Sequence, residues 1–378
     1  MDFLDHVSTA SSLLLRSFGV FFVVMAVIFV HEFGHYLVGR LCGIKALVFS
    51  LGFGPKILSY VDNHGTQWRL ALIPLGGYVK FVGDENEVDA LSSSVHGSFS
   101  SAHAWKKAAT VFAGPLFNVL LTVAILTFFF FSQGRIATEP VVGFLVKDAP
   151  AAQVGLMLGD RFIEMDGRRI ESFEDLAAYV AFHGGNPIEF KMERMGRVFT
   201  TVITPIMIEQ DDGFGNRVLG GAIGVAAPAD PNNPTRLDPA YEKRIHYNFM
   251  EAVVVALERT MRVATQTVFL IGRLIGGKED RCQLSGPSKT VKIAWRVSEA
   301  GFISLLNFAA FLSIGIGLVN LFPIPPLDGG HLLFHVVEAL SGSPVSAEIR
   351  QAVFYLGFCV VLLFMIFALF NDYFCWLS

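Results

Sequence analysis

Four long apolar stretches stand out along the chain, at roughly residues 17–38, 108–131, 301–322 and 352–370. A helix that crosses a bilayer needs about 20 mostly apolar residues, and each stretch supplies that length. The pattern therefore predicts a polytopic α-helical membrane protein with about four transmembrane helices. The first stretch carries His31, Glu32 and His35 and lacks a strongly basic leading region, so we interpret it as a span and not as a cleaved signal peptide.

Between the second and third stretches, the pattern changes to short β-rich runs separated by turn residues. Such runs lie at 141–146, 161–165, 188–193 and 198–203, and a helical pattern lies at 173–182. Asp166-Gly167 is a strong hairpin signal, because a tight turn needs residues that accept positive φ angles. We therefore expect residues 139–205 to form an inserted α+β domain.

An amphipathic helix is expected over residues 249–275, after a segment rich in Gly, Pro, Asp and Asn. Its apolar positions are interrupted by Glu258, Arg259, Arg262 and Arg273. Two placements remain open for this helix. It either lies on the outer membrane surface or packs on the outer domain.

The composition agrees with a membrane protein. Hydrophobic residues make up 53% of the chain and charged residues only 16%, whereas soluble proteins average about a quarter charged. A net charge of −4 gives no reason to expect nucleic acid as a partner. The four cysteines are too few and too scattered to indicate a disulfide framework or a thiolate zinc site.

Lysine and arginine residues predict the orientation, because short cytoplasmic loops are enriched in them. The leader before the first span carries only Arg16, and the tail after the fourth span carries neither residue type. The segment after the first span carries Arg40, Lys45, Lys56, Arg69, Lys80, Lys106 and Lys107. Residues 40–107 should therefore face the cytoplasm, with both termini and the α+β domain outside.

The motif His31-Glu32-Phe33-Gly34-His35 lies at the end of an apolar run that begins near Phe18. Residues four apart share one face of a helix, so the two imidazoles can bind one tetrahedral zinc ion. Glu32 is next to the first ligand, where it can accept a proton from water that zinc activates. The alternative is a set of polar residues that plugs a helix bundle. It is the weaker interpretation, because ionisable groups in a membrane helix are costly unless they face a cavity or bind something.

A catalytic zinc ion usually takes three protein ligands and keeps one position open. The third apolar stretch continues into Asn320-Leu321-Phe322-Pro323-Ile324-Pro325-Pro326-Leu327-Asp328-Gly329-Gly330. The prolines should end the helix and place Asp328 on a bend, where the two glycines allow a close approach. We therefore predict Asp328 as the third ligand. The alternative is a carboxylate that only closes a turn.

These two motifs, His31-Glu32-x-x-His35 and Asn320-x-x-Pro323 through Leu327-Asp328-Gly329, resemble those of the site-2 protease family, and more narrowly its bacterial RseP type. The run from Ala149 to Arg161 resembles part of a PDZ domain. One such domain is found here, where the long relatives have two. Further matching segments are Gly52-Phe53-Gly54-Pro55, Pro74-Leu75-Gly76-Gly77-Tyr78-Val79-Lys80, Gly114-Pro115-Leu116-Phe117-Asn118 and Leu284-Ser285-Gly286-Pro287.

The resemblance implies an intramembrane zinc metalloendopeptidase in which His31, His35 and Asp328 bind Zn²⁺ and Glu32 is the general base. It also implies that Asn320, near Pro323, helps to hold substrate at the broken helix. A role for Asn320 in satisfying backbone groups freed by the prolines is equally plausible. Asn118 either faces the same cavity or packs between helices, and we favour packing slightly.

The resemblance further implies that residues 52–80 form a cytoplasmic, membrane-associated β-hairpin, where a substrate strand pairs near Gly76 and Gly77. The alternative is a plain cytoplasmic hairpin. The implied substrates are single-pass membrane proteins, such as an anti-sigma factor, or signal peptides. The other implied partners are a peptide at the PDZ-like groove and the lipid bilayer. The implied location is the bacterial inner membrane, with the active site near its cytoplasmic side.

Two rival functions remain open. One is a membrane zinc protease that acts on peptides outside the bilayer and takes a Glu as third ligand. The other is a non-enzymatic scaffold or transporter that presents the PDZ-like domain.

The predicted domains are a first transmembrane helix with the His-Glu-x-x-His motif (1–40), a cytoplasmic loop with the hairpin (41–107), a second transmembrane helix (108–133), the PDZ-like domain (139–205), an extracytoplasmic strand, loop and amphipathic helix (206–299), a third transmembrane helix with its broken end (300–330), and a cytoplasmic turn with the fourth transmembrane helix (331–378).

Overall fold

The computed structural model describes residues 2–83, 97–211, 217–230, 233–275, 287–299, 301–343 and 345–377. Within these residues, four helices are long and apolar enough to cross a membrane, and they confirm the four predicted spans. They are α1 (Asp2–Leu41), α2 (Ala104–Gln133), α7 (Phe302–Asn320) and α9 (Ala347–Leu377).

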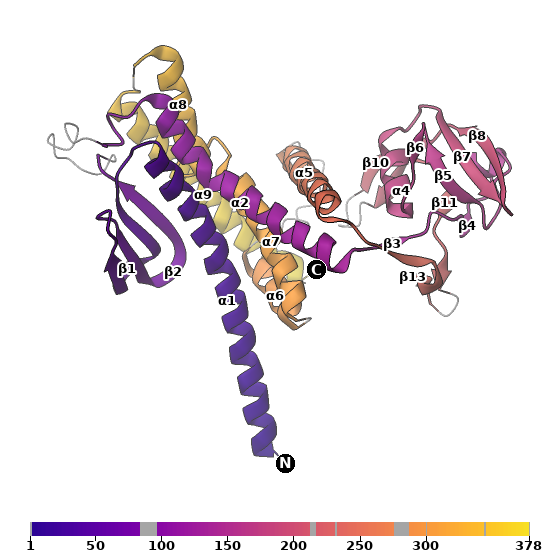
Figure 1. Cartoon of the computed structure of the whole chain (residues 1–378), viewed down its shortest axis with the longest axis horizontal. Coiled ribbons are helices and arrows are strands. Elements are labelled where there is room, and N and C mark those ends of the chain that lie inside the picture. Colours follow the sequence, from indigo (N-terminus) through magenta and orange to yellow (C-terminus); the bar gives the residue numbers. More distant parts are fainter. Residues whose placement is uncertain are drawn as a thin grey trace. The chain divides into compact units, whose positions relative to one another are not determined.

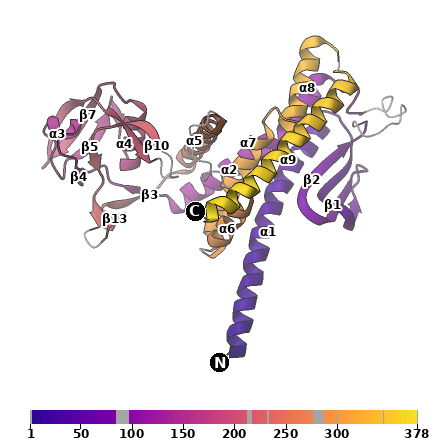
Figure 2. The same ribbon diagram turned by 180° about the vertical axis from the view of Figure 1, so that it is seen from behind.

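The chain divides into two compact units (Figures 1 and 2). The first unit contains the four long helices, with α2 counted up to Phe128, and a β-hairpin. The second unit contains the described residues from Phe129 to Met250. The remaining elements of the first unit are β1 (Ala46–Val61), β2 (Gln67–Phe81), most of α5 (Phe249–Ile275), α6 (Pro287–Glu299) and α8 (Asp328–Ser341).

Small residues let the long helices approach one another closely. A Cβ atom added at Gly34 of α1 would lie 2.5 Å from the carbonyl oxygen of Ala113 in α2. One added at Gly317 of α7 would lie 3.1 Å from the carbonyl oxygen of Pro115, also in α2. Such contacts are typical of helix packing in membranes, where shape complementarity replaces the hydrophobic effect. They bring α1, α2 and α7 together around the motif of α1.

The two strands of the first unit form an antiparallel hairpin that curls back on itself. Phe49 of β1 pairs with Val79 near the end of β2 and also with Trp68 near its start. Aromatic and aliphatic side chains join this sheet to the end of α1, through Tyr36, Ile44, Ala46, Phe49, Phe81 and Phe99. The predicted hairpin therefore exists and is anchored to the helix that carries the predicted zinc ligands His31 and His35.

A four-stranded antiparallel sheet with strand order β6-β5-β7-β8 forms the centre of the second unit. Asp166 and Gly167 take φ angles of 45° and 73° in the turn between β5 and β6, as predicted for a hairpin. The helix α4 (Phe173–Phe182) begins where the Ser172 hydroxyl accepts a hydrogen bond from the Asp175 amide. The bounds are β5 (Arg161–Met165), β6 (Arg168–Arg169), β7 (Ile188–Arg194) and β8 (Arg197–Ile203).

The core of this unit extends beyond the boundary predicted at residue 205. Ile223 is buried in the same core as Phe162 and Phe190, and β11 pairs with β4. A separate two-stranded ribbon, β3 with β14, joins the two ends of the unit. The remaining elements are β3 (Arg135–Thr138), β4 (Phe144–Leu145), α3 (Pro150–Gln153), β9 (Ile206–Asp211), β10 (Arg217–Ala222), β11 (Val225–Ala226), β12 (Ala229–Asp230), β13 (Asn233–Leu237), the 3-10 helix η2 (Pro239–Tyr241) and β14 (Glu242–Ile245).

Two helices differ from the sequence prediction. One amphipathic helix was expected between residues 206 and 299, and it is present as α5 with the predicted bounds. The same segment also contains a second helix, α6, which was not predicted. The helix α8 occupies 14 residues that were expected to form the end of span three and a cytoplasmic turn. Residues 284–286 of the fourth matching segment lie outside the described residues.

Candidate metal centre

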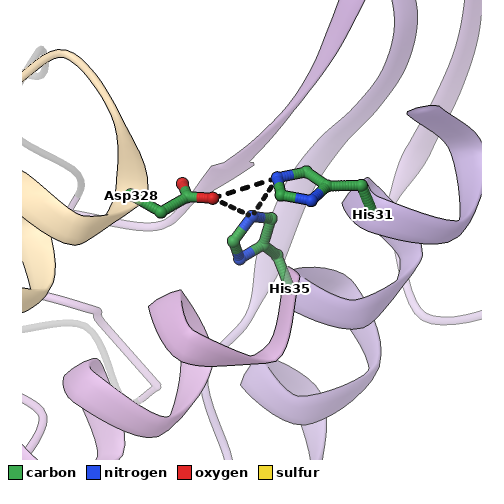
Figure 3. A group of neighbouring side chains, drawn as sticks. All are labelled: His31, His35 and Asp328. Carbon is green, nitrogen blue, oxygen red and sulfur yellow. Dashed lines mark hydrogen bonds and ion pairs between the residues drawn. The ribbon is translucent and has the colours of Figure 1, made fainter. Parts of the chain in front are cut away.

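The helix α1 presents His31 and His35 on one face, one helical turn apart. Their Nε2 atoms lie 3.3 Å from each other, and the two rings are nearly perpendicular, at 85°. Both imidazoles turn toward Asp328, which comes from a segment almost 300 residues later (Figure 3). The predicted pair is therefore formed, and the predicted third residue meets it.

Asp328 is the first residue of α8, directly after the bend between α7 and α8. The prediction that Asp328 lies on the bend itself is wrong by this one step. The bend is tight because Gly329 and Gly330 approach other backbone closely. A Cβ atom at Gly329 would lie 2.3 Å from the carbonyl oxygen of Leu321, and one at Gly330 would lie 2.4 Å from the nitrogen of Pro325.

The three side chains fit one zinc ion. The Oδ2 atom of Asp328 lies 3.0 Å from Nε2 of His31 and 3.5 Å from Nε2 of His35, and the two Nε2 atoms are 3.3 Å apart. Ligand atoms at about 2.0–2.1 Å from a tetrahedral zinc ion are about 3.3 Å from each other. Asp328 Oδ2 is also buried without a hydrogen-bond partner. Two imidazoles and one carboxylate form the donor set of a catalytic site with an open fourth position.

Groups of α2 contact both histidines from behind. The Nδ1–H of His35 donates to the carbonyl oxygen of Thr110 at 2.9 Å, which leaves its Nε2 lone pair for a metal. The amide of Asn118 lies 3.2 Å from Nδ1 of His31. A Cβ atom at Gly114 would lie 2.2 Å from Nε2 of His35, so α2 comes this close only because residue 114 is glycine.

Glu32 is buried and lies against the hairpin. A Cβ atom at Gly77 would lie 2.8 Å from Cγ of Glu32 and 2.9 Å from the carbonyl oxygen of Ser50. Gly76 takes a φ angle of 120°, and a Cβ atom there would lie 2.8 Å from the ring of Phe53. The two predicted glycines therefore lie on the strand segment that passes the predicted base.

Asn320, the last residue of α7, also reaches the site. Its Nδ2 atom lies 3.2 Å from Nε2 of His31. Pro323 is exposed on the link between α7 and α8, three residues later. Of the two predicted substrate-binding residues in this region, Asn320 contacts a histidine of the site and Pro323 belongs to the bend.

An ion pair between buried Lys107 of α2 and half-buried Glu338 of α8 connects the two helices, ten residues after Asp328 in the chain. The Nζ atom of Lys107 donates to Oε1 of Glu338 at 2.9 Å, and His335 lies 3.4 Å from the other oxygen of Glu338. Burial raises the pKa of Glu338, but the hydrogen bond and charge of Lys107, with a smaller contribution from His335, hold it below its usual range. This pair fixes the helix whose first residue is Asp328.

Sequence reasoning left one contributor to the site open and missed two others. For Asn118, packing between helices was slightly preferred over a position at the cavity of the site. In the structure it is fully buried and contacts His31. Gly114 was noted only as part of a matching segment. The carbonyl of Thr110 carries no side-chain signal at all. For Asn118, the signal was the amide itself, which is a costly group within a membrane span unless it has a polar partner.

Comparison with known proteins assigns the family. The model of peptidase family M50, the site-2 protease family, matches residues 19–364. This chain belongs to that family. A Bartonella henselae protein named "Putative zinc metalloprotease BH06270" is 72% identical over 358 residues, which cover 94% of this chain and 100% of that protein. The metalloprotease MmpA of Caulobacter vibrioides is 33% identical over 391 residues, which cover 95% of each chain.

The M50 chain is accordingly a metalloprotease whose metal is zinc. The rival interpretation as a non-enzymatic scaffold or transporter is therefore wrong. Among solved structures, the PDZ domain of an SdrC-like protein from Listeria monocytogenes matches 24% of this chain and 90% of that chain, at 24% identity and a TM-score of 0.20.

Proposed function

We propose that this M50 metalloprotease cuts the transmembrane segments of single-pass membrane proteins or signal peptides, with His31, His35 and Asp328 as zinc ligands and Glu32 as general base. The observation that carries the proposal is the triangle of two Nε2 atoms and one Oδ2 atom, with all three atoms within 4.8 Å of one another. Its two histidines lie in a helix that is long and apolar enough to cross a membrane. Peptide chemistry at such a site would act on substrates within the bilayer.

A bound zinc ion supplies Lewis acidity, which polarises the scissile carbonyl and makes water easier to deprotonate. Glu32 accepts the water proton and later delivers it to the leaving amine. Its place beside His31 in the chain supports this role. The carbonyl of Thr110 holds His35 in the tautomer that leaves Nε2 free. The ion pair between Lys107 and Glu338 stabilises the position of the helix that begins at Asp328.

The substrate must reach the site as an extended strand, because helical carbonyls are already hydrogen-bonded and shielded by the helix. Gly76 and Gly77 support strand pairing, since Gly77 lies beside Glu32 and neither residue has a side chain that would keep a substrate strand away. Asn320, on the other helix of the site, is suited to hold a substrate carbonyl with its amide. Exposed apolar side chains on the hairpin support its insertion into lipid. They include Phe53, Ile57, Leu58, Leu72 and Ile73.

The proposed location is the bacterial inner membrane, with residues 40–107 in the cytoplasm and the second unit outside. The distribution of Lys and Arg supports this orientation. The second unit is proposed to bind a peptide in a PDZ-like groove and so to control which membrane proteins enter. The proposed process is regulated intramembrane proteolysis, which releases a cytoplasmic fragment from a substrate such as an anti-sigma factor.

The test compares the wild-type protein with Glu32→Gln in liposomes that contain a purified single-span reporter. We expect Glu32→Gln to retain one zinc ion per chain and to cleave about 10² to 10⁴ times more slowly, the range expected for loss of a general base. Mass spectrometry of the fragments should place the cut inside the apolar segment of the reporter.

The matched control is Glu258→Gln, on an exposed position of α5, which should cleave at the wild-type rate. Normal cleavage by Glu32→Gln with zinc bound would show that Glu32 is not the base. A cut outside the apolar segment by the wild-type protein would contradict intramembrane cleavage and favour the rival protease that acts outside the bilayer.

A further inference from the structure

Asn118 is a buried amide in the middle of α2, and it contacts a predicted zinc ligand from the side opposite the metal. Its side chain is 0% exposed. Its Nδ2 atom lies 3.2 Å from Nδ1 of His31, while His31 directs its Nε2 atom to Asp328 at 3.0 Å. The two ring nitrogens of His31 therefore face different helices, and each nitrogen must have a defined protonation state.

An Asn118 amide that turns its Nδ2 atom to His31 conflicts with zinc binding. If Nδ2 donates to Nδ1, the proton of a neutral imidazole lies on Nε2, the atom that must be unprotonated to bind a metal. The Oδ1 atom of Asn118 is at the same time buried without a hydrogen-bond partner. Because the two ends of an amide have nearly the same shape, the side chain fits equally well when rotated by 180°. Oδ1 then accepts from Nδ1–H, and Nε2 is free.

Other groups hold the backbone of Asn118 in place independently of its side chain. The hydroxyls of Ser313 and Thr122 donate to its carbonyl oxygen at 2.9 Å and 3.0 Å. The Thr122 hydroxyl also lies 3.1 Å from the carbonyl oxygen of Ala310 in α7. These hydrogen bonds form a polar seam between α2 and α7, and they hold the backbone of Asn118 without using its side-chain amide.

We propose that Asn118 is a positioning residue of the metal centre: its side-chain oxygen accepts the Nδ1–H of His31 and keeps Nε2 unprotonated and aimed at the zinc ion. The proposal rests on the zinc ligands assigned under the proposed function. Hydrogen bonds to the outer nitrogen of a metal-bound histidine raise its strength as a ligand, and their loss typically lowers metal affinity about 10- to 100-fold. Asn118 would strengthen His31 as a zinc ligand in this way, with an amide that lies within the second candidate span.

The test measures zinc affinity by chelator competition in the full-length protein. Asn118→Leu keeps the side-chain size and removes the acceptor, so it should bind zinc about 10- to 100-fold more weakly. Asn118→Asp keeps an oxygen acceptor and should bind zinc at least as tightly as the wild type. Should Asn118→Leu fail to fold, Asn118→Ala takes its place with the same expected loss.

The control is Ser313→Ala, which removes a hydrogen bond from the same seam but not the contact with His31. It should lower the melting temperature of the metal-free protein and leave zinc affinity unchanged. Wild-type affinity in Asn118→Leu, an equal loss in Asn118→Asp, or an equal loss in Ser313→Ala would each overturn the proposal. A wild-type protein that binds no zinc would instead overturn the ligand assignment itself.

Discussion

Gly114 shows how little space separates the second span from the two histidines. Gly114→Ala would place a Cβ atom 2.2 Å from Nε2 of His35, so α2 must move away or the imidazole must turn. We expect zinc affinity to fall about tenfold or more, because a displaced ligand loses the geometry that the metal requires. Chelator competition on the purified variant measures this change.

The matched control for Gly114→Ala is Gly315→Ala in α7. A Cβ atom there meets nothing within 4 Å, and both changes replace a helical glycine in an apolar span. Gly315→Ala should bind zinc like the wild type. Equal zinc affinity in Gly114→Ala would mean that α2 does not touch the metal centre.

Residues that carry chemistry at a fixed spacing were predicted from sequence, and residues that support them were not. His31 and His35 are recognisable because one helical turn separates two side chains that can bind a metal ion. Asp328 is recognisable because prolines and glycines surround a carboxylate. Asn118 and the carbonyl of Thr110 act only through the pairing of α1 with α2. That pairing depends on Gly34 and Gly114, and no local pattern reports which helices meet.

Asp62 fixes the turn of the hairpin to the end of α1. Its Oδ1 atom accepts from the amides of His64 and Thr66, and its Oδ2 atom accepts from the Tyr36 hydroxyl and the Trp68 indole. Burial raises the pKa of Asp62, but these four hydrogen bonds outweigh it and lower the pKa to about 2. The carboxylate therefore ties a β-turn to the helix of the zinc motif.

This depressed pKa gives the anchor a defined pH dependence. A carboxyl group whose pKa is lower in the folded state stabilises that state above its unfolded pKa of about 3.9. The stabilisation is lost as the pH falls through the folded value of about 2. At neutral pH, Asp62→Asn should increase hydrogen exchange at Trp68 and Leu70 relative to the wild type. The difference should shrink as the pH approaches about 2, and a difference that is constant with pH would contradict the role of the charge.

At the scale of elements, the long helices and the hairpin were predictable, whereas α8 was not. Each span was predicted from a run of apolar residues, whereas the hairpin was predicted from the resemblance of residues 52–80 to the site-2 protease family. The helix α8 is only 14 residues long and begins right after a proline-rich bend. Its sequence therefore appeared to be the end of a broken helix followed by a turn. The contacts of Gly329 and Gly330 with the bend, and of Glu338 with Lys107, hold it in a helical form.

For the whole molecule, the orientation proposed from the Lys and Arg residues would put the second unit and the hairpin on opposite sides of the membrane. Met195 is fully exposed at the turn between β7 and β8, and His64 is exposed at the turn of the hairpin. In a chain whose four cysteines are replaced by serine, a membrane-impermeant maleimide should label Met195→Cys in intact cells stripped of their outer membrane. His64→Cys should be labelled only after the membrane is opened.

The reverse pattern of labelling would invert the orientation, and labelling of both sites in intact cells would contradict the number of spans between them. The activity of the cysteine-free chain is the control for its fold.

The extent of the second unit was less predictable than its existence. The turn at Asp166 and Gly167 is a local signal, but burial of Ile223 in the same core is a long-range contact that no pattern before residue 205 indicates.

One zinc ion is proposed to be bound by side chains from α1 and α8. X-ray absorption at the zinc edge of the purified full-length protein tests this assignment. We expect only nitrogen and oxygen neighbours at about 2.0–2.2 Å, with the outer-ring signals of two imidazoles, and loss of the bound zinc in Asp328→Ala. A sulfur neighbour at about 2.3 Å, or an unchanged spectrum and zinc content in Asp328→Ala, would contradict the claim.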